Sequence, residues 1–259
     1  MLEYTFSLDN IEIFLLILVR VSCFVYIAPF FGMVNVPGRV KIGLAVCIAF
    51  LISGFVDTSH VGYTGMLGYA VIVLKEGITG LLIGLAANIC NSIILFAGSL
   101  IDMDIGLSMA QQFDPINRTQ ATLTGNLYFY FILLLMLISD MHHVILNSFV
   151  DAFALIPVNG QIFEWEYLAS GFVTYLTDAF VISFRIMLPI FACIMILNSI
   201  LGIMAKVASQ MNMFAVGIQL KVLVGLAVLL VTVKLLPSVA NFIFTEMRKM
   251  MVLFVEGMY

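Results

Sequence analysis

The stretch that decides the fold is MLGYAVIVLKEGITGLLIGLAANICNSIILFAGSL, residues 66–100. Its only charged side chains are those of the neighbouring residues Lys75 and Glu76. A run of about 35 residues would be ~50 Å long as a helix, whereas a bilayer core requires only about 20 residues. The run therefore predicts a membrane helix that either breaks within its length or extends beyond the hydrocarbon layer.

The composition of the whole chain supports the same class of protein. Of its 259 residues, 63% are hydrophobic and 10% are charged, against about 45–50% and about 25% in soluble domains. The apolar residues form continuous runs rather than the alternating pattern of barrel strands, so we predict an all-α integral membrane protein. We expect about six hydrophobic helical segments, since further apolar runs lie near residues 11–31, 40–56, 123–139, 170–200 and 212–236. The run at 170–200 is also overlong.

A polar loop, IDMDIGLSMAQQFDP (Ile101–Pro115), follows the apolar run at residues 66–100. Gly106 suits a backbone conformation that other residues avoid, and Pro115 bars regular helix continuation. Irregular backbone at membrane depth is tolerated only inside protein or beside a water-filled cavity. Composition leaves two possibilities: an ordinary connection outside the membrane, or a re-entrant element whose Met, Phe and small polar side chains constrict a conduit.

Small residues recur every three or four positions after Lys75. They are Gly77, Gly80, Gly84 and Ala87. Residues at this spacing share one helix face, and a face of small side chains lets another backbone approach closely. The partner of this face is either another helix of the same chain or a neighbouring subunit.

Several charged residues lie inside apolar runs, where they are costly unless they face protein or water. They are Glu12, Arg20, Lys75, Glu76, Asp178, Arg185, Lys221 and Lys234. Asp178 and Arg185 are about two helical turns apart and so share a face. We interpret these residues as ion pairs and subunit contacts. The alternative is the substrate or ion path of a transporter.

The sequence offers no support for catalysis, because it contains neither a phosphate-binding loop nor a nucleophile elbow. Asp140, His142 and His143 form a D-x-H-H segment. Adjacent histidines on a helix point about 100° apart, whereas a helical zinc pair is spaced i, i+4, so we expect no metal site. The net charge of −4 indicates no nucleic-acid partner. The segment Ile156–Glu166, with its Pro and Asn-Gly pair, predicts an exposed or interfacial connection.

Four blocks, in order, resemble the flagellar branch of the FliR/SctT family of type III export-gate proteins. They are Arg20 through APFFG and VPGRVKIGLA to Ala45, KEGITGLLIGL at 75–85, IDMDIGLSMAQQFDP with Gln120 and Gly125, and SQMNMFAVGIQLKVLVGL at 209–226. Each block is weak alone, but the ordered set is specific and covers nearly the whole chain. The family usually has a neutral residue where Asp104 stands, and commonly proline at the positions of Ser209 and Gln219.

The resemblance implies one FliR-like export-gate domain over residues 1–259, with a FliP-like part near 1–165 and a FliQ-like part near 166–259. It implies assembly with FliP and FliQ, joined by FlhB and FlhA-like components, in the flagellar basal body of the bacterial inner (cell) membrane. In such assemblies, apolar helices pack into a helical hetero-oligomer that lies partly above the bilayer plane. Overlong runs would then be expected. The passengers would be unfolded flagellar proteins, and the chain itself would need no cofactor.

The resemblance also implies that the central loop plugs the closed pore of a non-enzymatic gate subunit. The plug and gating residues would be Gly106, Leu107, Ser108, Met109, Gln111, Gln112, Phe113, Asp114 and Pro115. Leu107, Met109 and Phe113 would provide the apolar seal. Two rival functions are a self-contained transporter or ion channel, and a structural scaffold in which the loop is a passive connection. The first rival would place Asp178, Arg185 and Lys221 on the transport path.

Overall fold

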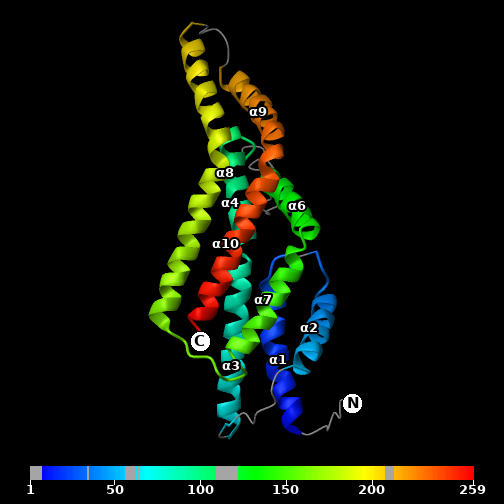
Figure 1. Cartoon of the computed structure of the whole chain (residues 1–259). Helices are drawn as coiled ribbons and strands as arrows, with labels where there is room; N and C mark the ends of the chain where they lie inside the picture. Colours follow the sequence, from blue (N-terminus) through cyan, green and yellow to red (C-terminus); the bar gives the residue numbers. More distant parts are fainter. Residues whose placement is uncertain (1–7, 34, 56–61, 64, 109–121, 208–212) are drawn as a thin grey trace. The chain divides into compact units, whose positions relative to one another are not determined.

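The computed structural model describes residues 8–33, 35–55, 62–63, 65–108, 122–207 and 213–259 (Figure 1). In these ranges the chain forms helices joined by turns and contains no strand, which confirms the all-α prediction. The helices are α1 (Leu8–Ile27), α2 (Gly38–Ser53), α3 (Gly65–Ala87), α4 (Ile89–Ile105), α6 (Leu123–Ile138), α7 (Met141–Leu155), α8 (Trp165–Val207), α9 (Met213–Thr232), the 3-10 helix η1 (Val233–Leu235) and α10 (Leu236–Glu256).

Three stretches of helix within the described ranges are long and apolar enough to cross a membrane. They are Gly65–Ala87, Trp165–Val207 and Ala215–Glu256, the last of which joins α9, η1 and α10. The successive helices α6 and α7 would count as a fourth span if taken together. By contrast, α2 and α4 have 16 and 17 residues, which is short of the about 20 residues that a span requires. The chain is an all-α protein whose helices suit a membrane.

The two overlong apolar runs behave differently. The run at 66–100 breaks at Asn88 into α3 and α4, and the Asn88 amide is shared between the Gly84 and Leu85 carbonyls, each 3.0 Å away. The run at 170–200 instead forms part of α8, which has 43 residues in total and is not interrupted by Pro189. At the usual helical rise, α8 is about 65 Å long. One run therefore breaks and the other extends well past the thickness of a bilayer core.

Contacts divide the chain into two compact units. Unit 1 consists of Met1–Cys90, Asp140–Tyr175 and Phe244–Tyr259, and unit 2 consists of Asn91–Ser139 and Leu176–Ile243. Each unit draws on both halves of the sequence. This division by contacts therefore differs from the parts at 1–165 and 166–259, which stay a prediction.

The core of unit 1 is built around α1, which packs against α2 and α3 (Figure 1). On another side of α1, Phe24 stacks on Phe149 of α7, with ring centroids 4.0 Å apart, and Phe153 meets Phe149 edge-on at 5.4 Å. All three rings are buried. Aromatic side chains bury large areas, and such ring pairs add about 0.5–1.5 kcal/mol beyond area burial. The rings therefore fasten α7 to α1.

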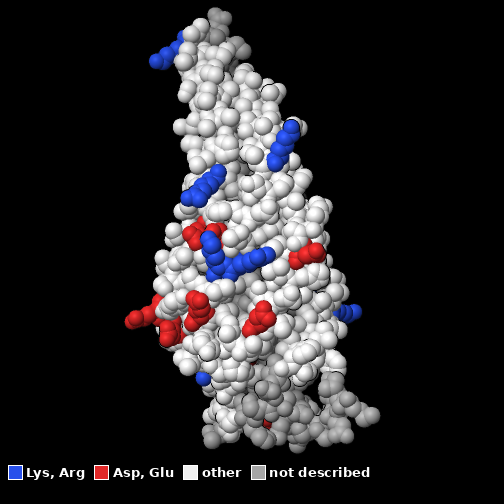
Figure 2. Space-filling view, in the orientation of Figure 1, with Lys and Arg blue, Asp and Glu red and all other residues white. Residues whose placement is uncertain are grey.

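The surface of the single chain is unusually apolar. Large hydrophobic side chains stay exposed along most helices, among them Phe180 and Phe184 on α8 and Leu230 and Val231 on α9. Most of the face in Figure 2 is neither acidic nor basic. Exposed apolar surface on this scale indicates contact with lipid or with other protein chains rather than with water.

Candidate functional site

The predicted plug segment begins where α4 ends, in unit 2. Gly106 follows the helix with a φ of +92°, and its amide donates a hydrogen bond to the Asp102 carbonyl at 3.1 Å. Glycine adopts this conformation without steric cost, so the end of α4 is encoded locally. Leu107 and Ser108 follow and are half-buried. The remaining predicted plug residues lie outside the described part of the chain, namely Met109, Gln111, Gln112, Phe113, Asp114 and Pro115.

Two buried side chains hold the two ends of this loop together. The Thr124 hydroxyl, in the first turn of α6, lies 2.5 Å from Asp102 Oδ1 and 2.8 Å from the Gly98 carbonyl, and these two acceptors share its single proton. The Thr124 amide also donates to Asp102 Oδ1 at 3.3 Å. Asp102 and Thr124 are 1% and 3% exposed. A carboxyl group that accepts amide and hydroxyl protons at a helix N-terminus is favourably placed.

The same crossing requires the backbones of α4 and α6 to lie very close together. A methyl group on Gly98 would overlap the Cα and amide nitrogen of Gly125. Small residues permit this approach because no side chain separates the helices. We refer to Gly98, Asp102, Thr124 and Gly125 together as the loop anchor. It holds together the end of α4 and the start of α6, between which the predicted plug residues lie.

Two acidic residues lie near the end of α4. Asp102 Oδ2 and Asp104 Oδ2 are buried and have no hydrogen-bond partner among the described residues. Burial raises the pKa of the Asp104 carboxyl above its ordinary value, and the positive charge of Lys221 on α9 opposes part of that rise. Lys221 is itself half-buried. One of the three predicted buried charges therefore lies close enough to this region to act on it.

The other two predicted buried charges lie on α8. Asp178 is half-buried and Arg185 is exposed in the single chain. An exposed arginine on an apolar helix is costly in hydrocarbon, so it calls for contact with protein, water or lipid headgroups. The assignment of Asp178, Arg185 and Lys221 to subunit contacts stays a prediction.

The small-residue stripe lies on α3, in unit 1, and faces α1 of the same chain; it consists of Gly77, Gly80, Gly84 and Ala87. A methyl group on Gly80 would overlap the Arg20 carbonyl, and one on Gly84 would come within 3.2 Å of the Phe24 carbonyl. Gly77 has more room, with side-chain atoms of α1 at 3.7 Å, and Ala87 is fully buried. Gly80 and Gly84 thus let the backbone of α3 lie close against α1.

A buried ion pair sits beside this stripe. Arg20 Nε lies 2.5 Å from Glu76 Oε2, and both side chains are 0% exposed. Arg20 also donates to the Ile156 carbonyl at 2.8 Å, and its guanidinium carbon lies 4.4 Å from the centre of the Phe153 ring. Charge, hydrogen bonds and ring contact together compensate the arginine for its lost hydration.

The second carboxylate oxygen of Glu76 binds the connection between α7 and α8. Glu76 Oε1 accepts the Asn159 amide at 2.8 Å and the Gln161 side-chain amide at 3.1 Å. Ile156 and Gln161 are buried, whereas Trp165 is 72% exposed. The connection is therefore partly exposed, at Pro157 and Gly160 as well as at Trp165, while contacts with Arg20 and Glu76 bury Ile156 and Gln161.

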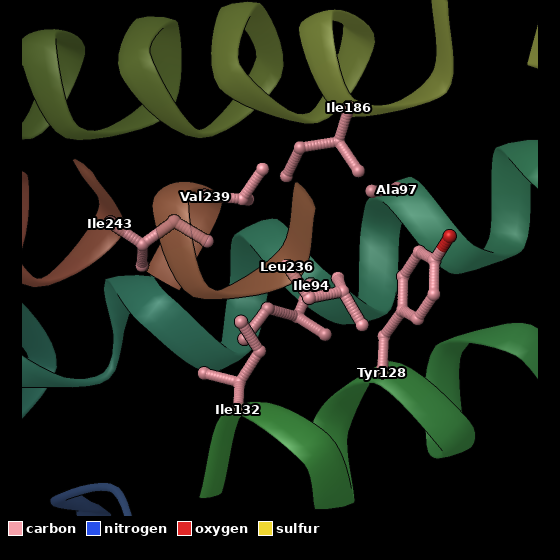
Figure 3. A pocket seen from close by; sticks show the side chains of 8 residues that line it. All are labelled: Ile94, Ala97, Tyr128, Ile132, Ile186, Leu236, Val239 and Ile243. Carbon is pink, nitrogen blue, oxygen red and sulfur yellow. The ribbon is translucent and has the colours of Figure 1, made fainter. Parts of the chain in front are cut away.

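Unit 2 also contains a small apolar pocket (Figure 3) with about 210 Å³ of empty space including its mouth. It is lined by Ile94, Ala97, Tyr128, Ile132, Ile186, Leu236, Val239 and Ile243. The one polar atom of the lining side chains, the Tyr128 hydroxyl, shares a hydrogen bond with Thr232 at 3.4 Å. A substrate site normally combines a larger volume with several convergent polar groups. This pocket reads as imperfect helix packing and gives no support to a transporter.

The loop anchor makes a direct prediction for stability. Replacing Thr124 with valine keeps the shape of the side chain but removes the hydroxyl, which leaves buried Asp102 Oδ1 with only the weak amide contact. We expect a loss of about 1–2 kcal/mol in unfolding free energy, measured by denaturant unfolding of the purified chain. Thr124→Ser retains the hydroxyl and should lose less. Equal losses in the two variants would show that the hydroxyl is not what stabilises the anchor.

Sequence reasoning identified part of this site. Gly106 and the loop were singled out from composition, and Gly125 belongs to a block that carries the family resemblance. The pairing of Asp102 with Thr124 across 22 positions was missed, as was the approach of Gly98 to Gly125. A small residue at 98 inside an apolar run was the available signal, but spacing alone does not indicate its partner.

These observations define a helical membrane protein with a polar loop anchored at both ends. The chain matches the family described as bacterial export proteins, family 1, over residues 11–247. It is 30% identical over 247 residues to flagellar biosynthetic protein FliR of Bacillus subtilis, covering 92% of each chain. It is 26% identical to the FliR protein of Aquifex aeolicus, and this alignment covers 92% of each chain. It is 27% identical to the FliR protein of Escherichia coli, and this alignment covers 88% of this chain and 87% of the other. The chain belongs to this bacterial export family.

Proposed function

We propose that this chain is a non-enzymatic subunit of the flagellar type III protein-export gate. It assembles with FliP and FliQ, together with FlhB and FlhA-like components, in the basal body at the bacterial inner membrane. Unfolded flagellar proteins pass through the assembled gate. The chain contributes helices to the assembly and a loop that closes the pore, and it uses no cofactor.

The observation that carries this proposal is the family match over residues 11–247, together with flagellar relatives aligned over about nine-tenths of the chain. The apolar exposed surface supports it, because a chain that functions in a hetero-oligomer has helix faces for its partners to cover. The 43-residue helix α8 also fits a subunit that extends beyond the bilayer.

The loop anchor supports the plug role in particular. A segment that seals a pore and later moves must be free in its middle but fixed at both ends, or it would not return to the same place. Asp102 and Thr124 provide buried fixed ends, and Gly106 provides the turn that releases the chain from α4. Apolar side chains such as Leu107, Met109 and Phe113 would then close the conduit without binding ions.

The test is to express this chain with its FliP- and FliQ-like partners and to measure small-ion leak across the cell membrane. In one variant Gly106–Pro115 is deleted. In a second variant of unchanged length, Leu107, Met109 and Phe113 are replaced by serine. We expect both to assemble and both to leak, because deletion removes the plug and serine admits water where apolar contact should exclude it.

The control is Arg185→Gln together with Asp178→Asn, which neutralises charges that a self-contained transporter would place on its path. If our proposal is correct, the membrane of cells with this variant does not leak small ions. Any loss of protein export in this variant is then accompanied by a loss of complex assembly. If both loop variants assemble and stay tight, the loop is not the seal. If the chain alone transports and the neutralised variant does not, the transporter is the better function.

A further inference from the structure

A cluster of metal-ligating side chains lies at the start of α7, in unit 1 and outside the loop anchor. Asp140, His142 and His143 each place one ligand atom so that all three atoms lie within 4.8 Å of one another. Asp140 Oδ1 and His143 Nδ1 are 3.5 Å apart. A metal about 2.1 Å from both of these atoms would see them at roughly 110°, close to the tetrahedral angle.

The local backbone explains how adjacent histidines meet. Asp140 adopts a left-handed conformation, with a φ of +54°, immediately before α7 begins. In the first turn that follows, the His142 and His143 rings lie side by side, with centroids 4.0 Å apart and planes inclined by 37°. Helical spacing alone predicts that the two side chains diverge. The turn at Asp140 instead brings its carboxylate back to the paired rings.

Two of the three ligand-bearing side chains are open to solvent, and the third carries a ring nitrogen that no described residue engages. The side chains of Asp140 and His143 are 77% and 66% exposed, so an ion can reach them from solvent. His142 packs against Phe30, with ring centroids 5.9 Å apart, and its Nδ1 is buried and has no hydrogen-bond partner among the described residues. A hydrogen bond to protein therefore does not compete for that nitrogen. The Asp140 carboxylate supplies negative charge at a helix N-terminus, where the helix dipole alone would disfavour a cation.

We infer that Asp140, His142 and His143 form a binding site for a divalent first-row transition metal ion such as Zn²⁺. Two imidazoles and one carboxylate suit ions of this class, whereas Mg²⁺ and Ca²⁺ prefer oxygen ligands alone. Three protein ligands leave at least one coordination position for water or a further group. The ion would fix the turn before α7 by tying Asp140 to the first turn of the helix.

The experiment is a Co²⁺ titration of the purified full-length chain, followed by visible absorption. The chain carries a histidine-free purification tag and is stripped with a chelator before use. Its thiols are blocked, because Cys47 is exposed and thiolates bind the same metals. We expect saturable binding of one Co²⁺ per chain. His143→Gln and His142→Ala should each lower the Co²⁺ affinity by more than about 10–100-fold. That range is the loss expected when a residue that only hydrogen-bonds to a metal ligand is replaced.

The matched control is His60→Ala, which removes the third histidine of the chain and should leave the affinity unchanged. Because His143 is largely exposed, His143→Gln should fold normally, and its melting temperature without metal verifies this. Zn²⁺ should raise the melting temperature of the unsubstituted chain but not that of His143→Gln. Equal Co²⁺ affinity in the unsubstituted chain and in His143→Gln, or no saturable binding at all, would overturn the inference.

Discussion

Replacing Glu76 with alanine is expected to lower the unfolding free energy of the chain by about 3–5 kcal/mol. The substitution leaves the Arg20 guanidinium fully buried, with carbonyl oxygens and the Phe153 ring beside it but without a counter-charge. It also deprives the Asn159 and Gln161 amides of their acceptor. Natural domains are stable by only about 5–15 kcal/mol, so this change would remove a large part of the stability of the chain.

The measurement is denaturant unfolding of the purified chain, with Glu76→Ala, Arg20→Met and the double variant completing a thermodynamic cycle. We expect the double variant to be more stable than Glu76→Ala, because it contains no uncompensated buried charge. Lys249→Ala is the matched control, since the Lys249 side chain, 2.6 Å from Glu246, is 64% exposed, whereas Arg20 and Glu76 are both fully buried. It should change stability by at most about 1 kcal/mol. If Glu76→Ala costs no more than this control, the buried pair does not hold the fold.

Replacing Gly98 with alanine should cost about 3 kcal/mol, at the upper end of the range for overpacking. The added methyl group would overlap the backbone of Gly125, and a backbone is less able to move aside than the end of a flexible side chain. The helices α4 and α6 would have to separate, which would pull Thr124 away from Asp102. We therefore expect the loop to lose its fixed ends, so that the assembled gate becomes leaky or fails to export.

The control for Gly98→Ala is Gly202→Ala on α8. Gly202 has open space where a methyl group would be added, and alanine favours a helix over glycine by about 1 kcal/mol. This variant of the single chain should be as stable as the original or slightly more stable. Thermal unfolding of both variants provides the comparison. A Gly98→Ala chain as stable as Gly202→Ala would mean that α4 and α6 need not lie in close contact.

The general architecture followed from the sequence because it depends on local and compositional properties. Continuous apolar runs and a shortage of charge predict membrane helices wherever the chain goes. The turn at Gly106 was also predictable, since a positive φ after a helix favours glycine in any context. The break at Asn88 was anticipated only as one of two alternatives. The choice between breaking and extending depends on what each helix packs against.

The contacts of the site could not be derived in the same way. Periodicity places Gly77, Gly80 and Gly84 on one face of α3, but it does not reveal whether the facing backbone belongs to α1 or to another chain. Charged residues at 20 and 76 were recognised as costly in an apolar run, yet they are separated by 56 positions. Nothing in the spacing of two such residues shows that they pair.

What the sequence by itself determined is therefore the class of protein, the family and local turns such as the one at Gly106. Each of these depends on residues that are neighbours along the chain. Only the tertiary structure decided which residues distant along the chain meet, such as Arg20 with Glu76 and Asp102 with Thr124. The physical reason is that hydrophobic burial is non-directional and drives many packings equally well. Close backbone approach, hydrogen-bond geometry and charge compensation then select one of them, and these depend on the path of the chain in space.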